Sequence, residues 1–270
     1  MSRGLLVLAG AGDVGGRLAA LRLARGEEVI ALRRRDAAAT PGLRRLRADL
    51  ASGEGLARLP RHAEAIVFCA APDQRDEAAY RALYLDGLRR LLDACDAPRV
   101  VFVSSTAVYG EDAGEGVDET TVPRPPAFNG RVLLESENVL DPHPGGIALR
   151  LSGIYGPGRE AMLRKARSQE PGASRWTNRI HVQDAAAALS HLIDLPQPSP
   201  LYLGSDDAPV LESELLAWIR AREGLPDASA RAGPEGGRRI RNARLRASGW
   251  QPAFPDYRSG YEALLTGPGV

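Results

Sequence analysis

A glycine-rich loop near the amino terminus constrains the fold of this chain more than any other feature. It reads Gly10-Ala11-Gly12-Asp13-Val14-Gly15, follows the apolar run Leu5 to Ala9, and opens an amphipathic stretch with Val14, Leu18, Leu21 and Ala24 at helical spacing. In such a loop the first glycine permits a tight turn, the second lets a pyrophosphate approach the backbone, and the third lets helix and strand pack closely. The helix amino terminus adds free amides. We therefore predict dinucleotide contacts at Gly10, Gly12, Asp13, Val14 and Gly15.

Composition narrows the class of protein. The chain has 270 residues, a formal net charge of +1 and 44% hydrophobic residues, enough for a full core and without the charge excess of a polyanion binder. No apolar segment approaches the roughly 18 residues that span a bilayer, and Leu5 to Ala9 is too short for a signal-peptide core. The basic residues at 238–246 alternate with apolar ones and lack stacking aromatics. We expect a cytoplasmic protein with a small-molecule partner, and no nucleic-acid or membrane partner.

Cysteine and histidine usage argues against a metal site. Cys69 and Cys95 are too few for a disulfide framework or a cysteine-based zinc site, and we interpret both as small core residues. The four histidines show no metal-ligand spacing.

Strand-like runs alternate with helix-like segments along the first part of the chain. The runs are Leu5 to Ala9, Val29 to Leu32, Ala65 to Ala70, Val100 to Ser104 and Ile147 to Leu151, and the clearest helical segments are Asp76 to Cys95 and Arg131 to Leu140. This alternation predicts an α/β protein with a doubly wound parallel sheet of the Rossmann type. Ligands bind at the carboxyl ends of such strands, so we expect Ala70, Ala71 and Ser104 to contact the cofactor as well.

The segment after the second strand bears on the choice between NADP and NAD. It reads Arg33-Arg34-Arg35-Asp36, and arginines at this place would pair with a 2′-phosphate, whereas an acid would bind the ribose hydroxyls. Because Arg33 and Arg34 come first, we favour NADP, with NAD bound through Asp36 as the alternative. Asp49 is placed either to meet the adenine amino group or to cap a helix.

Several blocks together resemble the extended short-chain dehydrogenase/reductase superfamily. They are SSTAVYG at 104–110, RLSGIYGPGR at 150–159 and NRIHVQD at 178–184. The carboxyl-terminal blocks at 202–209, 238–246 and 249–250 are similar to the atypical YeeZ-like branch of NAD-dependent epimerase/dehydratase proteins. The resemblance implies a nucleotide-binding domain at 1–155, with 178–204 returning to it. It also implies a small substrate lobe formed by 156–177 and 205–270.

The superfamily's chemistry depends on a Ser or Thr, a Tyr, and a Lys four residues after that Tyr. Ser105 matches the first position. Asn129 and Leu133 fall where the tyrosine and lysine belong, and the only lysine, Lys165, follows Ala161 at that spacing, so the chain contains no YxxxK. Thr106-Ala107 likewise replaces the Asp-Glu pair of the dehydratases.

Other residues must then perform acid/base catalysis and bind the substrate. Tyr109 and Tyr155 are candidate catalytic phenols, with packing as the alternative role. Candidate substrate contacts, each with a structural alternative, are Thr106, Arg131, Arg159 and His181. Asp184 is interpreted as a helix N-cap.

Three functions fit these observations. The preferred one is an NADP-dependent oxidoreductase acting on a small carbonyl or hydroxyl substrate. The alternatives are a catalytically inactive NAD(P)-binding sensor or scaffold, and a nucleotide-sugar epimerase/dehydratase. Whether the chain is an enzyme depends on whether other residues replace the missing tyrosine-lysine pair. The apolar face of Asp76 to Cys95 is compatible with a homodimer or with an internal core position.

Overall fold

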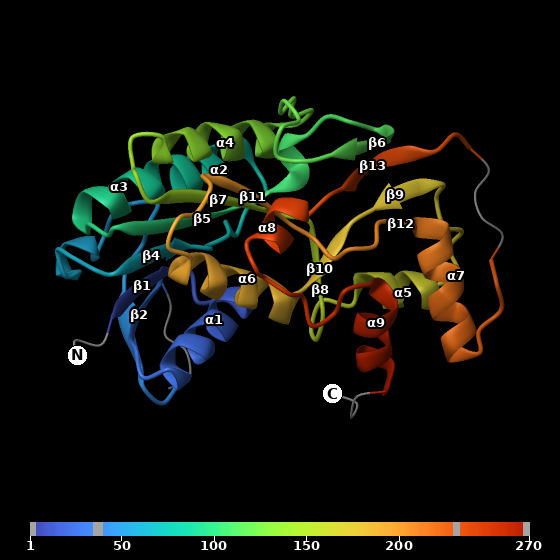
Figure 1. Cartoon of the computed structure of the whole chain (residues 1–270), viewed down its shortest axis with the longest axis horizontal. Helices are drawn as coiled ribbons and strands as arrows, with labels where there is room; N and C mark the ends of the chain where they lie inside the picture. The colour runs from blue at the N-terminus through green and yellow to red at the C-terminus, as the bar shows by residue number, and fades with distance from the viewer. Residues whose placement is uncertain (1–3, 35–39, 229–232, 267–270) are drawn as a thin grey trace. The chain divides into compact units, whose positions relative to one another are not determined.

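The computed structural model describes residues 4–34, 40–228 and 233–266. The chain divides into two compact units, whose elements are labelled in Figure 1. The first unit comprises Met1–Tyr109, Pro123–Arg150 and Ala186–Tyr202. The second comprises Gly110–Val122, Leu151–Ala185 and Leu203–Val270.

One sheet has seven strands, in the order β11-β7-β5-β4-β1-β2-β3. Its strands are β1 (Leu5–Ala9), β2 (Glu28–Arg33), β3 (Leu43–Arg47), β4 (Ala65–Phe68), β5 (Arg99–Ser105), β7 (Gly146–Leu151) and β11 (Leu201–Gly204). β1 pairs in parallel with β2 and with β4, and the β2–β3 and β4–β5 pairs are parallel too. The predicted Rossmann-type sheet is confirmed, and the order changes direction at β1, where ligands of this fold bind.

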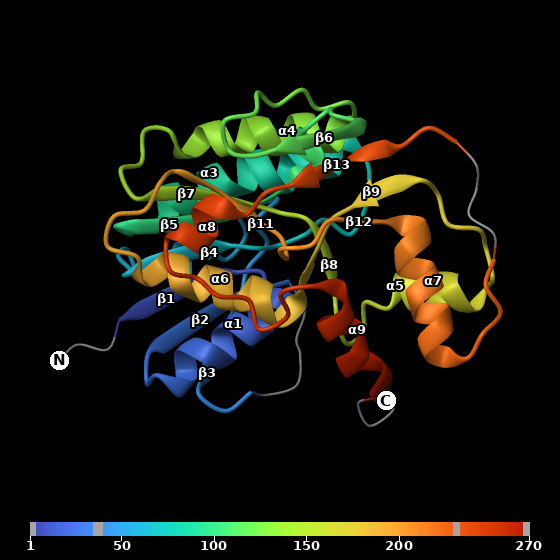
Figure 2. The same cartoon turned by 45° about the vertical axis from the view of Figure 1, so that its right-hand side comes forward.

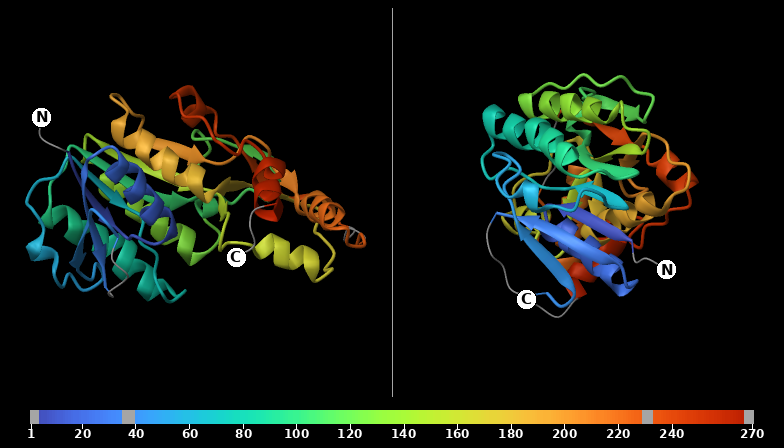
Figure 3. Two further views of the ribbon diagram at one scale, coloured as in Figure 1. Left: turned by 90° about the horizontal axis from the view of Figure 1, so that it is seen from below. Right: turned by 90° about the vertical axis from the view of Figure 1, so that its left-hand side faces the viewer.

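Helices cover both faces of this sheet. Figures 2 and 3 show α1 (Asp13–Ala24) and α6 (Val182–Asp194) on one face, with α3 (Gly87–Ala94) and α4 (Phe128–Glu137) on the other. Shorter helical segments complete this part: η1 (Leu56–Arg58), α2 (Glu77–Tyr80), the π-helical η2 (Arg81–Asp86), η3 (Thr106–Val108) and η4 (Asn138–Leu140). The predicted helix from 76 to 95 is therefore α2, η2 and α3 in succession.

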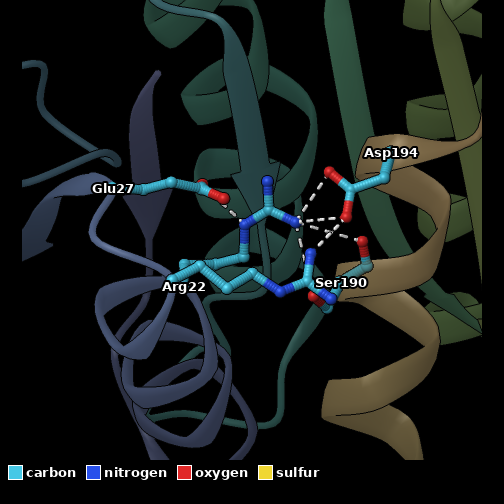
Figure 4. A network of polar contacts seen from close by, with 5 residues as sticks. Arg22, Glu27, Ser190 and Asp194 are labelled. Atoms are coloured by element: carbon cyan, nitrogen blue, oxygen red, sulfur yellow. Dashed lines mark hydrogen bonds and ion pairs between the residues drawn. The ribbon is translucent and has the colours of Figure 1, made fainter. Parts of the chain in front are cut away.

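A buried arginine ties α1 to α6 (Figure 4). Arg22 is only 5% exposed, and its Nε donates to Glu27 at 2.7 Å. Its Nη1 donates to both carboxylate oxygens of Asp194 at 2.8 Å and lies 3.3 Å from the carbonyl of Ser190. Leu21, which the helical spacing places on the buried face, is instead 42% exposed. That expectation is wrong, because the face of α1 that turns inward carries Arg22 and Leu18.

The second unit contains two small sheets. A four-stranded sheet has the order β12-β9-β13-β6, and a two-stranded sheet pairs β10 with β8. These strands are β6 (Ala113–Val117), β8 (Gly153–Tyr155), β9 (Arg175–Thr177), β10 (Arg179–His181), β12 (Val210–Leu211) and β13 (Gly236–Ile240). The helices are α5 (Ala161–Arg167), α7 (Glu212–Glu223), α8 (Ala243–Ala247) and α9 (Tyr257–Thr266). A core cluster that includes Leu163, Leu216 and Tyr261 joins α5, α7 and α9.

Candidate functional site

Two glycines of the loop are required by the fold itself. Gly10 has φ +99°, and a Cβ on it would lie 2.4 Å from the backbone nitrogen of Ala70. A Cβ on Gly15 would lie 2.1 Å from the Gly10 carbonyl oxygen and 2.8 Å from the Cys69 sulfur. The Cys69 thiol donates to that same carbonyl, and burial raises its pKa to about 12. Cys69 is thus a neutral packing residue beneath the loop.

Gly12 differs from these two glycines. Its Cβ would have no atom within 4 Å, its chain neighbours aside, among the residues that the structure describes. Gly12 immediately precedes α1, at the positive end of the helix. Packing within the protein therefore does not explain a glycine here, whereas a ligand that approaches the backbone would.

A pocket of about 220 Å³ opens beside this loop. It is lined by Gly10, Ala11, Gly12, Leu32, Arg33, Arg34, Ala48, Asp49, Leu50, Ala70, Ala71 and Leu83. These residues follow or end β1, β2, β3 and β4, apart from Leu83, which comes from η2. Seven of the residues predicted to contact a cofactor thus lie together: Gly10, Gly12, Arg33, Arg34, Asp49, Ala70 and Ala71.

The other predicted cofactor contacts do not line this pocket. Asp13 is paired with Arg17 at 3.1 Å, and Val14 and Gly15 are packed into α1. Ser104 is buried and donates to Glu137. Sequence reasoning missed the apolar walls formed by Leu32, Ala48, Leu50 and Leu83, since aliphatic residues carry no signal that separates a pocket wall from a core.

The polar groups of the pocket have defined partners. Nη2 of Arg34 lies 2.8 Å from a carboxylate oxygen of Asp73, and both side chains are about half exposed. The Asp49 carboxylate accepts from the Ala51 amide at 2.9 Å, in a turn before η1. Arg35 and Asp36 lie outside the described residues.

Ser105 ends β5 and begins the next turn. Its hydroxyl accepts from the Ala107 amide at 3.2 Å and caps η3, which starts at Thr106. Accepting this bond leaves the Ser105 hydroxyl hydrogen available to a substrate oxygen. Both Ser105 and Thr106 are partly exposed.

A buried polar network holds Tyr109. Arg150 donates to the Tyr109 hydroxyl at 2.7 Å and to the two carboxylate oxygens of Glu137 at 2.6 to 3.2 Å. Burial alone would lower the pKa of Arg150, but the hydrogen bond and charge of Glu137 raise it. Tyr109 is 0% exposed. A phenol in this position is surrounded by protein groups.

The phenol of Tyr155 lies in the second unit. Its ring stacks on Tyr261 with 4.7 Å between centroids, and its hydroxyl has no hydrogen-bond partner among the described residues. Burial raises the pKa of Tyr155. Its neighbour His181 is 2% exposed, with its Nδ1 accepting from the Gln183 amide at 3.4 Å and its ring 4.0 Å from that of Phe254.

The predicted role of Asp184 is wrong. Helix α6 begins at Val182, so Asp184 lies inside the helix and does not precede it. Its carboxylate accepts from the amides of Ala253 and Phe254 at 2.7 and 3.0 Å. Asp184 therefore fixes the chain before α9, and burial raises its pKa.

The two arginines proposed as substrate contacts are exposed. Arg131 lies 3.9 Å from Glu77, a distance at which a solvated ion pair is weak. The Arg159 amide donates to the Gly156 carbonyl in the turn after β8. Across the described ranges 4–34, 40–228 and 233–266, no group of His, Cys, Asp or Glu side chains could hold a metal ion. None of the helices in those ranges is long and apolar enough to cross a membrane.

Comparison with known proteins decides the family. The profile of the NAD dependent epimerase/dehydratase family matches residues 5–131. A solved structure from Methylobacillus flagellatus, described as a candidate NAD-dependent epimerase/dehydratase, is 38% identical, with a TM-score of 0.86 and 98% of each chain covered. The chain belongs to this family. The family predicted from the sequence blocks is therefore confirmed.

A curated relative and a further solved structure extend the comparison. Protein YeeZ of Escherichia coli (strain K12) is 37% identical over 124 residues, or 44% of this chain and 45% of YeeZ. That match spans less than half the length of the curated relative. MoeE5, solved in complex with UDP-glucose and NAD, is 24% identical with a TM-score of 0.80 over 96% of each chain, a likeness in fold.

Asn129 and Leu133, the positions at which the superfamily resemblance predicts a tyrosine and a lysine, lie in helix α4. Leu133 is 5% exposed, and a Cβ on Gly130 would lie 2.4 Å from the Ala107 carbonyl oxygen, so α4 packs directly on η3. The lysine of the chain, Lys165, lies in α5 and pairs with Glu212 at 2.7 Å. Leu133 carries no charge, and the Lys165 ammonium is paired with Glu212, so neither residue matches the lysine of the tyrosine-lysine pair.

Proposed function

We propose that the chain binds a nicotinamide dinucleotide, preferentially NADP, in the pocket beside Gly12 and is an oxidoreductase acting on a small carbonyl or hydroxyl substrate. The observation that carries this proposal is the open backbone at Gly12, where a Cβ would meet no atom within 4 Å among the described residues, its chain neighbours aside. This glycine lies next to a pocket that Arg33 and Arg34 also line. Family membership supports the binding of a nicotinamide dinucleotide, because the family is described as NAD dependent. The proposed preference for NADP rests on Arg33 and Arg34.

The pyrophosphate would lie against the backbone of Gly10 to Gly12. The amides that begin α1 point out of the helix and carry its positive end, so they favour an anion without needing a basic side chain. A side chain at Gly12 would fill that space. Ala70 and Ala71 form the opposite wall with small side chains, which suits a group lying close to the backbone.

The adenosine would lie at the ends of β2 and β3. Leu32, Ala48 and Leu50 give this part of the pocket an apolar wall for the adenine ring, and Asp49 offers an acceptor for its amino group. Arg33 and Arg34 would lie beside the 2′-phosphate that the ribose of NADP carries. The planar guanidinium group of each arginine fits a phosphate.

The nicotinamide, when bound, accepts or donates a hydride. Ser105 would donate its hydroxyl hydrogen to the substrate oxygen, with Thr106 beside it. Tyr155 is the candidate proton donor, because its hydroxyl has no hydrogen-bond partner among the described residues.

The catalytically inactive sensor or scaffold is the second candidate function. The observation that favours it is Leu133, an apolar side chain packed into the core where the superfamily's lysine is expected. Epimerase or dehydratase chemistry on a nucleotide sugar is the third candidate, supported by the family's name.

Titration followed by a turnover assay tests the proposal. The purified chain is titrated with NADP and NAD, and NADPH oxidation at 340 nm is then followed with a panel of small aldehydes and ketones. We expect NADP to bind more tightly than NAD, and turnover that falls at least about 100-fold in Ser105→Ala while NADP affinity is kept. Binding without turnover supports the sensor. NAD that copurifies tightly bound supports the epimerase, and no dinucleotide binding contradicts all three functions.

A further inference from the structure

The ion pair between Arg34 and Asp73 lies at the proposed adenosine site. In the sheet, β1 lies between β2 and β4. Arg34 directly follows β2, and Asp73 lies in the loop after β4, two residues beyond Ala71, which lines the pocket. The 2.8 Å contact between their side chains therefore joins the two segments that flank the glycine loop.

We propose that Asp73 sets the cofactor preference of this chain by competing with the 2′-phosphate of NADP for Arg34, so that binding of NADP exchanges the partner of Arg34 and binding of NAD does not. The inference rests on the proposed function. It adds an acidic residue from the loop after β4 to the determinants of specificity.

The energetics permit such an exchange. The side chains of Arg34 and Asp73 are 47% and 55% exposed, and ion pairs this exposed contribute little to stability and are screened by salt. A phosphate carries more charge than a carboxylate and offers three acceptor oxygens, so it forms the stronger pair with a guanidinium. The exchange breaks one weak contact and forms a stronger one, with no change in covalent bonds.

The same geometry predicts that Asp73 weakens NADP binding in two ways. It holds Arg34 in a pair that must open, and it leaves a carboxylate beside the incoming phosphate once that pair has opened. NAD has only a hydroxyl at this position and experiences neither effect. Removing the charge of Asp73 should therefore raise the preference for NADP.

Asp73→Asn tests this inference, and Asp96→Asn is its matched control. Asp96 is also an exposed acid in an ion pair, 3.8 Å from Nδ1 of His62, but it precedes β5 at the amino ends of the strands. We expect Asp73→Asn to tighten NADP binding about two- to fivefold in low salt and to leave NAD unchanged. The gain should shrink at higher ionic strength, and Asp96→Asn should behave as the wild type.

The Arg34→Ala background isolates the mechanism. If Asp73 acts through Arg34, most of the gain from Asp73→Asn disappears in the double variant. A wild type that prefers NADP, together with an Asp73→Asn variant of unchanged or weaker NADP affinity, overturns the inference and leaves the proposed function standing. A wild type that binds no dinucleotide overturns the proposed function itself.

Discussion

The carbonyl of Gly10 and the α-carbon of Gly15 approach so closely that a Cβ on Gly15 would lie 2.1 Å from the Gly10 oxygen. The start of α1 is thereby pressed against the turn that precedes it. Gly12, between these residues, has open space. The loop thus contains glycines required for folding and one glycine available to a ligand, and substitutions can separate the two roles.

Gly15→Ala should destabilise the protein. The added methyl would overlap the Gly10 carbonyl, which is backbone and cannot rotate away, as well as the Cys69 sulfur, and overpacking of this kind costs about 1–3 kcal/mol. Gly16→Ala is the matched control, since its Cβ meets no atom within 4 Å among the described residues and alanine favours a helix. Urea unfolding measures both. Equal stabilities for the two variants would contradict the described packing of the loop.

Arg22→Ala should lower the free energy of unfolding by about 2–3 kcal/mol. It leaves Glu27 without its 2.7 Å partner and removes the buried link from α1 to Asp194. The figure lies below that of a fully buried pair, because Asp194 is 44% exposed. Arg25→Ala, which removes an exposed partner of the same Asp194, should cost under about 1 kcal/mol. Denaturant midpoints of the two variants measure this difference in stability. A larger loss of stability for Arg25→Ala than for Arg22→Ala would refute this ranking.

Asp206 should make the stability depend on pH. Burial raises its pKa to about 8, with the charge of Arg179 opposing the rise, so the native state holds a proton that the unfolded chain releases near its ordinary value of 3.8. The stabilisation is complete below pH 3.8 and is lost as the pH rises towards 8. Asp206→Asn should remove a slope of about 1.4 kcal/mol per pH unit between pH 5 and 7. Unfolding curves at several pH values measure it, and parallel pH profiles for variant and wild type would exclude this role.

Tyr155→Phe separates a catalytic from a packing role. The hydroxyl has no partner among the described residues, so its removal should leave stability unchanged or slightly raised. If Tyr155 donates the proton, kcat should fall at least about 100-fold while the Kd for NADP is kept. Tyr109→Phe, which loses the bond from Arg150, should cost about 1–2 kcal/mol of stability instead. Full activity in a stable Tyr155→Phe variant would remove Tyr155 from the mechanism.

The parallel sheet could be predicted because each of its early strands is a continuous apolar run. Leu5 to Ala9 is β1 exactly as expected, and Val29 to Leu32 extends by one residue at each end. Strand β4 ends at Phe68, two residues early, because 69–71 turn towards the glycine loop. The four-stranded sheet was not predicted, because β6 reads AGEGV and its partner β13 lies about 120 residues later in the sequence. Neither strand has the apolar alternation that marks a strand locally.

The candidate site could be predicted only in part. Glycines and arginines after strands carry a local signal, so Gly12 and Arg34 could be assigned from the sequence. Leu83 and Asp73 reach the same place from other segments, and a contact across the fold has no local signature. Arg22 shows the same limit, because helical spacing favours Leu21 for the buried face until the partners of Arg22 on α6 are known.

The central claim is that Gly12 faces a dinucleotide, and calorimetric titration of Gly12→Val against Gly16→Val tests it most directly. Both positions are open in the protein, so both variants should fold, as thermal unfolding will check. We predict micromolar NADP binding by the wild type and by Gly16→Val, and at least a 100-fold loss in Gly12→Val, since the side chain would occupy the place of the pyrophosphate. Unchanged NADP affinity in a folded Gly12→Val variant would contradict the account.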